Sequence, residues 1–307
     1  MAMDVGNFGD LLDKRVTKAF YDRMKQLPDR IPDFYMMETS KDSYERWSQI
    51  GDLADFVQFN GTVTYQDISQ GYDVTAEHLA FSNGLQITRQ LYDDDRHGVW
   101  ERQAPGLADS WQRTRQSEGM RMFNLAFSVD SKYYSNTESV ALCSNSHTTT
   151  SGASTASGFD NLTTGSLNAV NVGSVRTQMR GFRGDVANRI SVSPSLLLVP
   201  IDLIDRADEI TKSDKQPDSA NNNYNPQQRF HSTDSEYLTD TNNWWMIDES
   251  RMKEWLIWFD RIPIEFGRAE EFDSFIAKWR AYARFSYMWL NWRWILGSQV
   301  SKGERGY

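Results

Sequence analysis

The stretch Val186–Ile210, VANRISVSPSLLLVPIDLIDRADEI, decides the fold that we predict for this chain. From Ile190 to Val199 its apolar residues form a short, almost continuous run bounded by Pro194 and Pro200, which is typical of a strand buried on both faces. Pro200 then fixes φ where a helix can begin, and apolar residues recur at near-helical spacing among acidic ones. Because helix-patterned Leu162–Phe182 leads into it, the predicted unit is helix, loop, buried strand, turn and helix.

Composition limits the class of protein. The chain has 307 residues, of which 39% are hydrophobic and 24% charged, so it is globular and long enough for two compact domains or one elaborate domain. A net charge of −9 argues against a protein that grips nucleic acid, because such a grip comes from Lys and Arg. Cys143 is the only cysteine, which excludes an intrachain disulfide, and we expect it to be buried. No signal peptide or membrane span is recognised, so we predict a protein made in a cytoplasm.

The first third of the chain lacks a core of its own. Asp10–Leu27 is predicted to be an amphipathic helix that packs either on its own core or on a neighbouring subunit. Lys41–Asp95 is predicted to be a two-stranded excursion, with partial period-two alternation in Phe56–Tyr65 and Leu85–Leu91. A ribbon of this kind is marginally stable alone, so it should lie on something else.

A long helix is predicted from Val99 to Phe127. Its apolar face is Leu107, Trp111, Met122 and Leu125, and its water-facing side is Arg113, Arg115, Glu118 and Arg121. Ser144–Gly158, rich in Ser, Thr and Gly, is predicted to be a mobile loop or hinge between domains, with His147 solvated.

The end of the chain is rich in tryptophan. After the loop-like, polar Thr211–Thr241, the short strand Trp244–Ile247 and the extended run Arg280–Gly297 are predicted. Eight of the 11 Trp lie after residue 243, which indicates an aromatic core or a buried interface. Trp-rich strands also form sugar-binding platforms, so that alternative stays open.

No motif predicts catalysis, so we assign no catalytic, cofactor-binding or metal-binding residue and expect no enzyme. Asp93-Asp94-Asp95 could bind a divalent cation, but we favour acidic residues that complement a helix dipole. A hydrolase would need two carboxylates facing each other at roughly 5–10 Å, and pairs such as Asp248-Glu249 or Glu270-Glu271 arise by chance among 42 acidic residues.

The order of several stretches resembles the major capsid (major head) protein of tailed bacteriophages, especially the Mu-type major head subunit. The resemblance extends from about residue 40 to 297 and depends on the order of motifs that are individually loose. The stretches are NGLQITRQLYDDDRHGVWERQAPGLADSWQRTRQ (Asn83–Gln116), SVALCSNSH (Ser139–His147), LTTGSLNAVNVGSVRTQMRGFRG (Leu162–Gly184), RISVSPSLLLVPIDLIDRADEI (Arg189–Ile210), NNNYNPQQ (Asn221–Gln228), YLTDTNNWWMIDE (Tyr237–Glu249) and RIPIEFGRAEEFDSFIAKWRAYARFSYMWLNWRWILG (Arg261–Gly297).

The resemblance implies a fold and its parts. The implied fold is the α+β tailed-phage major capsid fold, with an N-terminal arm, an extended β-hairpin loop, an axial domain and a peripheral domain that carries a long spine helix. By resemblance, residues 1–40 are the arm and 41–95 the extended loop. Residues 96–145 and 263–301 form the peripheral domain, and 146–262 the axial domain. In this family the arm and the loop both lie across neighbouring subunits.

The implied function is structural: copies of the chain self-assemble as hexamers and pentamers into an icosahedral head shell that encloses double-stranded phage DNA without reading its sequence. The implied location is the virion, after assembly in the host cytoplasm, with no membrane and no cofactor. A portal and scaffold or decoration proteins are the further implied partners. Because Lys41 is the only lysine of the loop region, we expect no Lys–Asn cross-link of the kind known in some members. Charge alone suggests Arg113, Arg115, Arg280 and Arg284 as subunit contacts.

Two alternatives accompany this prediction. An encapsulin-type compartment shell shares the general fold and holds enzymes in place of DNA. An aromatic-rich carbohydrate-binding or adhesion protein of a phage particle would need exposed, coplanar Trp side chains, whereas a capsid subunit needs them buried.

Overall fold

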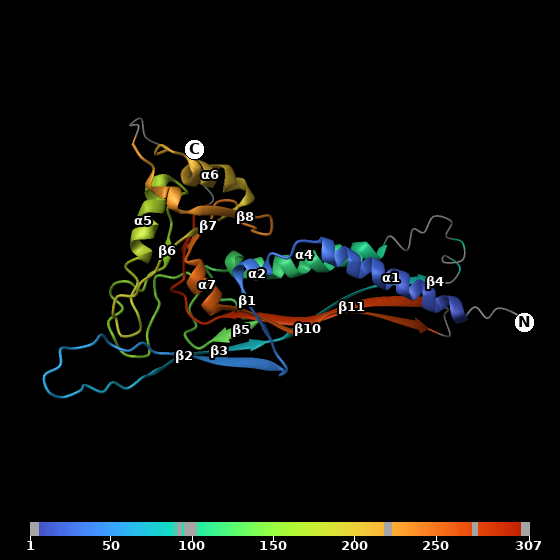
Figure 1. The fold of residues 1–307 in the computed structure, drawn as a ribbon, viewed down its shortest axis with the longest axis horizontal. Coiled ribbons are helices and arrows are strands. Elements are labelled where there is room, and N and C mark those ends of the chain that lie inside the picture. Colours follow the sequence, from blue (N-terminus) through green and yellow to red (C-terminus); the bar gives the residue numbers. More distant parts are fainter. Residues whose placement is uncertain are drawn as a thin grey trace, which may run out of the picture.

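The computed structural model describes residues 6–88, 90, 94, 103–217, 223–271 and 276–301, and the side chains of these from residue 16 to 269 and from 276 onward. Its architecture is mixed α+β, as predicted, and elongated (Figure 1). The elements are α1 (Gly6–Gln26), α2 (Ile31–Phe34), β1 (Met36–Thr39), β2 (Tyr44–Ile50), β3 (Gln70–Glu77), β4 (Leu79–Thr88), α4 (Gln103–Asn124), β5 (Tyr134–Asn136), β6 (Leu162–Thr163), α5 (Ala169–Met179), β7 (Leu196–Pro200), η1 (Ile201–Leu203), α6 (Ile204–Lys212), η2 (Pro226–Arg229), β8 (His231–Ser235), β9 (Trp244–Ile247), α7 (Glu249–Trp255), β10 (Leu256–Glu271), β11 (Ile276–Trp289) and β12 (Ile295–Ser298).

The predicted central strand is confirmed as β7, in which every residue is buried. It lies inside a five-stranded sheet of order β6-β12-β9-β7-β8, parallel to β8 and antiparallel to β9. The strand begins at Leu196, whereas the apolar run begins at Ile190. Before Leu196 the backbone bonds to a side chain and not to a neighbouring strand, since Ser193 N donates to Asp248 Oδ2. The helix predicted after Pro200 is confirmed as η1 followed by α6.

Two predictions beside β7 need correction. Leu162–Phe182 is not one helix, because β6 occupies its start and α5 begins only at Ala169, where the Asn168 side chain accepts from Asn171 N and caps the helix. The polar 211–241 region is not all loop, because it contains η2 and the strand β8. Strand β8, HSTDS, lies at the edge of its sheet, where one side faces water and a polar sequence is stable.

A second, four-stranded sheet has the order β1-β10-β11-β4. Its long antiparallel pair β10–β11 runs away from the five-stranded sheet, and α4 and α1 cover one face of it (Figure 1). Helix α1 packs on its own chain: Phe20 is fully buried and stacks on Phe266 at 4.7 Å between ring centroids, and Arg23 Nε pairs with Asp109 at 2.7 Å. The helices predicted at Asp10–Leu27 and Val99–Phe127 are confirmed as α1 and α4, except that residues 99–102 lie outside the described part of the chain.

Most of the tryptophan is core. Of the Trp residues after position 243, only Trp255 is not fully inside, and Trp258 stacks on Phe285 at 4.7 Å in the middle of the main hydrophobic cluster. Cys143 is buried in the same cluster, as expected, and burial raises the pKa of its thiol well above the ordinary value. None of the described Trp side chains is exposed, so they form no platform of the kind that the carbohydrate-binding alternative needs.

The extended excursion differs from its prediction. Strands β2 and β3 pair antiparallel and β5 joins them, but Phe56–Tyr65 is not a strand. The second alternating set, with Leu85 and Ile87, lies in β4, which pairs with β11 of the four-stranded sheet. The alternation of apolar and polar residues therefore predicted a strand correctly, but this strand pairs with β11, which is distant in the sequence.

Arg115 was expected to face water and does not. It is buried against Trp258, with its guanidinium carbon 4.9 Å from the ring centroid, and it donates to Asp260 at 2.9 Å and to Asp29 at 3.3 Å. A long Arg stem can cross an apolar face when carboxylates receive its head, so helical periodicity misassigned this residue.

Candidate assembly surfaces

The loop at residues 51–69, between β2 and β3, is the most exposed apolar part of the described chain. Phe56 is 106% exposed and Tyr65 90%. The other exposed apolar residues of the loop are Leu53, Val57, Phe59, Val63 and Ile68. No Lys or Arg occurs from residue 47 to 88. A contiguous exposed apolar surface of this kind is typical of a protein–protein contact.

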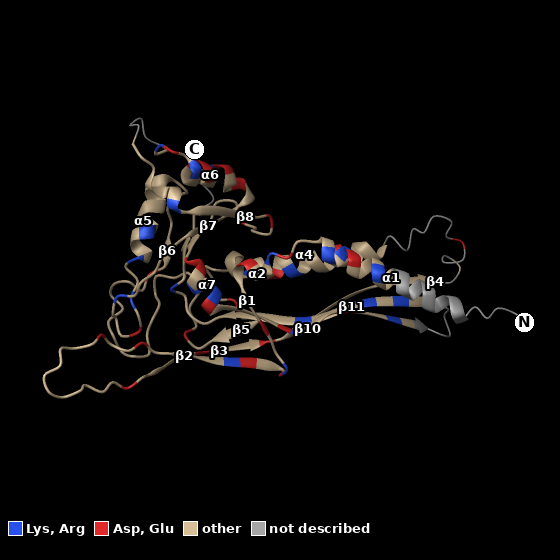
Figure 2. Ribbon diagram, in the orientation of Figure 1, with Lys and Arg blue, Asp and Glu red and all other residues tan. Residues whose placement is uncertain are grey.

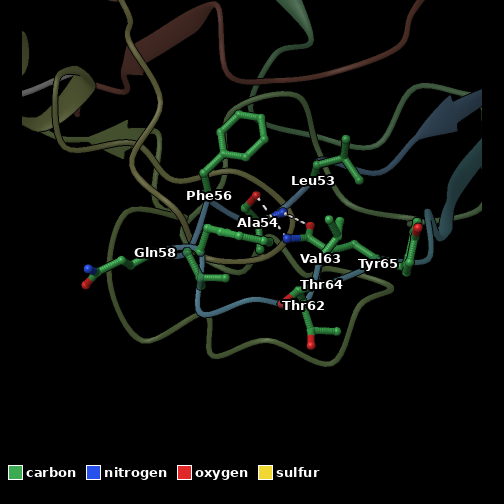
Figure 3. A pocket seen from close by; sticks show the side chains of 11 residues that line it. Leu53, Ala54, Phe56, Gln58, Thr62, Val63, Thr64 and Tyr65 are labelled. Atoms are coloured by element: carbon green, nitrogen blue, oxygen red, sulfur yellow. Dashed lines mark hydrogen bonds between the residues drawn. The ribbon is translucent and has the colours of Figure 1, made fainter.

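The Gln66 side chain joins the two limbs of the loop. Ala54 N donates to Gln66 Oε1 at 2.8 Å, and Gln66 Nε2 donates back to Ala54 O at 3.4 Å. These bonds take the place of one rung of a β-ladder, and beyond them the two limbs surround a hollow of about 450 Å³ (Figure 3). The loop therefore presents both its side chains and an apolar hollow to another molecule.

A clamp holds the base of the loop against residues 183–188. Asp52 Oδ2 accepts from Asp185 N at 3.1 Å, and Asn188 Nδ2 donates to Leu53 O at 3.4 Å. Gly184 leaves room for the Asp52 carboxylate, because a Cβ at that position would lie 2.1 Å from Asp52 Oδ2. The base of the loop is thus held to residues 183–188 by a close contact that a larger residue at position 184 would disturb.

A buried arginine supports the clamp from beneath. Arg293 Nη2 donates to Asp185 Oδ1 at 3.1 Å, and its Nε donates to Arg183 O at 2.5 Å. The guanidinium lies over the Trp292 ring, 4.7 Å from its centroid. Burial raises the pKa of Asp185 against the lowering effect of Arg293, and burial lowers the pKa of Arg293. The pair is a buried cation and carboxylate, which stabilises only as a complete unit.

The Ser/Thr-rich segment is tied to the same place. Thr149 and Ser151 donate to Asp185 O, and Thr150 Oγ1 donates to Gln70 O at 3.0 Å. Tyr72 and Thr148 share a hydrogen bond of 2.6 Å between their hydroxyls. The Ser and Thr residues of Ser144–Gly158, whose composition predicted a hinge, therefore donate hydrogen bonds to backbone carbonyls at the base of the 51–69 loop.

The prediction for His147 was wrong. The residue is 2% exposed and its ring stacks on Trp292 at 4.3 Å. Its Nδ1 lies 3.0 Å from Glu138 Oε1 and its Nε2 lies 3.1 Å from Asn161 Oδ1. No spacing signal could have revealed this, because Glu138, Asn161 and Trp292 come from three separate segments.

The other candidates divide as follows. Arg113 and Arg280 are exposed, and Arg284 Nε donates to His78 O at 3.0 Å within the chain. Asp248 caps α7 by accepting from Arg251 N, and Glu249 accepts from Ser195 Oγ, so each has a structural role. Asp93, Asp95 and the side chains of Glu270 and Glu271 lie outside the described residues.

Within the described part, no cluster of His, Cys, Asp or Glu is placed to hold a metal, and no helix has the length and apolarity of a membrane span.

Comparison with known proteins identifies the chain. A family model described as phage capsid protein matches residues 72–297. The chain belongs to the phage capsid protein family. This capsid protein is accordingly a major capsid shell protein, and its place is the virion. The predicted fold class and function are confirmed at this level, and the family is one of structural capsid proteins.

Solved structures show the same fold at low sequence identity. A structure from Mycobacterium phage Patience is 7% identical, with a TM-score of 0.56 over 90% of that chain and 98% of this one. The procapsid of bacteriophage JBD30 is 11% identical, with a TM-score of 0.53 over 78% of that chain and 98% of this one. The holo-SrpI encapsulin complex of Synechococcus elongatus is 8% identical, with a TM-score of 0.50 over 87% of that chain and 88% of this one. No curated protein sequence matches this capsid protein.

Proposed function

We propose that this capsid protein closes as hexamers and pentamers into an icosahedral head of the Mu type, around packaged double-stranded DNA. The observation that carries the proposal is the 51–69 loop, which exposes Phe56 and Tyr65 but is anchored by a buried clamp. An apolar loop that is free at its tip and fixed at its base is suited to binding a second subunit. A large heterologous contact of this type closes into rings.

The domain assignment remains part of the proposal. The five-stranded sheet with α5 and α6 corresponds to the axial domain, and the long four-stranded sheet with α4 to the peripheral domain. The predicted boundary at residue 262 falls inside β10, and β12 returns to the five-stranded sheet. Helix α1 packs on its own α4, so an arm that reaches a neighbour would use the exposed side of this helix.

The test is assembly of the chain alone. We expect size-exclusion chromatography with light scattering, followed by negative-stain electron microscopy, to find five- or six-membered rings or closed shells. A monomer or dimer at every concentration, still unassembled beside candidate scaffold, portal or protease partners, would contradict the proposal.

The second candidate is an encapsulin-type compartment, which the similarity to the SrpI complex supports. Purified particles distinguish the two by their contents. Nuclease-protected DNA of uniform length in particles from a productive host supports the head, whereas a co-purifying enzyme without DNA supports the compartment.

A further inference from the structure

One surface of the axial region collects arginines without carboxylates. From Asn161 to Gly184 the chain contains no Asp or Glu, although its total is 42 acidic residues. Helix α5 packs on η2, where Gln227 Nε2 donates to Ala169 O at 3.3 Å and a Cβ on Gly173 would lie 3.1 Å from the same atom. Three and seven residues beyond Gly173, on this side of the helix, come Arg176 and Arg180.

Arg229, at the end of η2, adds a third guanidinium. Helix α5, which carries Arg176, contacts η2, so Arg229 lies on the neighbouring element, and Arg180 caps the end of α5. The pKa of Arg176 is lowered, first by burial and then by the positive charges of Arg229 and Arg180. In the described part of the chain none of the three forms an ion pair with a carboxylate. Val170, near the start of the same helix, is 66% exposed. We define these four residues as the arginine face.

A second surface has the opposite sign. Asp202 in η1 and Asp205 and Glu209 in α6 are exposed, and the spacing of three and four residues places them on one side (Figure 2). Glu209 is partly neutralised by Arg206 at 2.5 Å, whereas Asp202 and Asp205 have no ion pair among the described residues. Ile201, at the start of the same turn, is 57% exposed. Ile201, Asp202, Asp205 and Glu209 form the acidic face.

The two faces lie on different helices of one region. In the sheet of order β6-β12-β9-β7-β8, α5 contacts β12 and β9, and α6 contacts β7 and β8, while η2 contacts both helices. Figure 1 shows α5 and α6 as separate helices of this region. A contact between the arginine face of one copy and the acidic face of the next is head-to-tail, and such contacts form a ring when their rotation closes. Each face also combines charge with one exposed aliphatic side chain, a mixture that fits a protein partner better than DNA phosphates.

We propose that the arginine face docks on the acidic face of the next copy of this chain around each ring. This inference rests on the proposed ring assembly. The contact selects head-to-tail neighbours, because two arginine faces or two acidic faces repel each other.

Charge reversal tests the contact. Arg176→Glu with Arg180→Glu, and separately Asp202→Arg with Asp205→Arg, should each lower the assembled fraction in sedimentation velocity roughly tenfold or more at low salt. The four changes together should return assembly to within about threefold of the unmodified chain, because the attraction is restored with its sign exchanged. The matched control is Lys41→Glu with Lys253→Glu, two exposed cations outside the two faces, which should assemble normally.

Circular dichroism identifies any charge-reversal variant that fails to fold. Cross-linking then tests the same contact without reversing a charge. Cys143 is buried and is the only cysteine, so Val170→Cys with Ile201→Cys gives a chain with one reactive thiol on each face. A short bismaleimide added to assembled particles should give a denaturing-gel ladder up to five or six subunits. Monomer bands alone would overturn the proposal.

Failure of the docking proposal can be distinguished from failure of the proposed function. Normal assembly of either double variant, no recovery in the combined variant, or loss of DNA retention without loss of assembly overturns the docking proposal alone. An unmodified chain that never forms rings or shells overturns the proposed function as well.

Discussion

At the scale of single residues, Arg293 and Gly184 support the contacts that hold the base of the 51–69 loop. Arg293 is a buried cation whose carboxylate partner, Asp185, also presents its backbone to Asp52 of the loop. Removing one partner of a buried ion pair typically costs about 3–5 kcal/mol, because the other charge stays buried and unpaired. Gly184 contributes only space for the Asp52 carboxylate, so substituting it tests the contact without leaving a buried charge unpaired.

We predict that Gly184→Ala loosens the loop. The new Cβ would lie 2.1 Å from Asp52 Oδ2 and 2.4 Å from Asn188 Oδ1, so both side chains must turn away, and the hydrogen bond from Asp185 N to Asp52 Oδ2 is lost. Hydrogen exchange of residues 51–69 and 183–188 should become faster. Gly106→Ala is the control, because no atom lies within 4 Å of its added Cβ and exchange at the loop should not change. Unchanged exchange in Gly184→Ala would refute the clamp.

The second residue prediction concerns pH. Hydrogen bonds from Ser48, Arg46 and Gln70 hold the pKa of Asp73 at about 2, below its ordinary value of 3.8. A carboxyl whose pKa is lowered by folding contributes stability above its unfolded pKa, and this contribution is lost as the pH falls from about 4 to about 2. Ser48→Ala should raise the pKa of Asp73.

The measurement is urea unfolding of the wild type and Asp73→Asn as a function of pH. The wild type should be the more stable at pH 6, and the difference should disappear as the pH approaches 2. A difference that is independent of pH would show that the ionised carboxylate contributes nothing. Because Asp73 is accessible to water, we expect a small effect.

At the scale of elements, α1 has two sides with different roles. One side buries Val16 and Phe20 against α4 and the long sheet, and the other exposes Tyr21. We predict that deletion of Met1–Pro28 leaves a subunit that folds but assembles poorly. It should also be less stable, since loss of a buried Phe side chain alone typically costs about 3–5 kcal/mol.

Point variants separate the two effects of that deletion. Phe20→Ala should lower the thermal midpoint, whereas Tyr21→Ala should leave it nearly unchanged while assembly, followed by light scattering, declines. Normal particles from the truncated chain would show that α1 is no intersubunit arm.

At the scale of the whole molecule, the exposed apolar surface of the 51–69 loop is the surface that we propose a neighbouring subunit covers. We predict that Phe56→Ser, Val57→Ser and Phe59→Ser together leave the unfolding free energy of the isolated subunit within about 0.5 kcal/mol, because these side chains are exposed. Shells should not form. Thermal unfolding and electron microscopy measure the two outcomes, and Thr62→Ser on the same loop is the control. Shells of normal yield would exclude the loop from the contact.

Patterns that act between near neighbours in the chain were predictable from the sequence. The apolar run before Pro200 determined β7, and the 3.6-residue period determined α1 and α4. The order of motifs along the chain, together with these elements, also indicated the capsid family. These signals are local, so no tertiary partner was needed to recognise them.

Only the tertiary structure decided which distant groups share one environment. His147 is buried because Glu138, Asn161 and Trp292 surround it, and Arg115 is buried because Asp29 and Asp260 receive its charge. Strand β8 is a strand because β7 offers a free edge, despite a polar sequence. The clamp of Asp52, Asp185 and Arg293 joins residues that are far apart along the chain. Burial and pairing depend on the partner that folding supplies, and the order of residues along one chain does not name that partner.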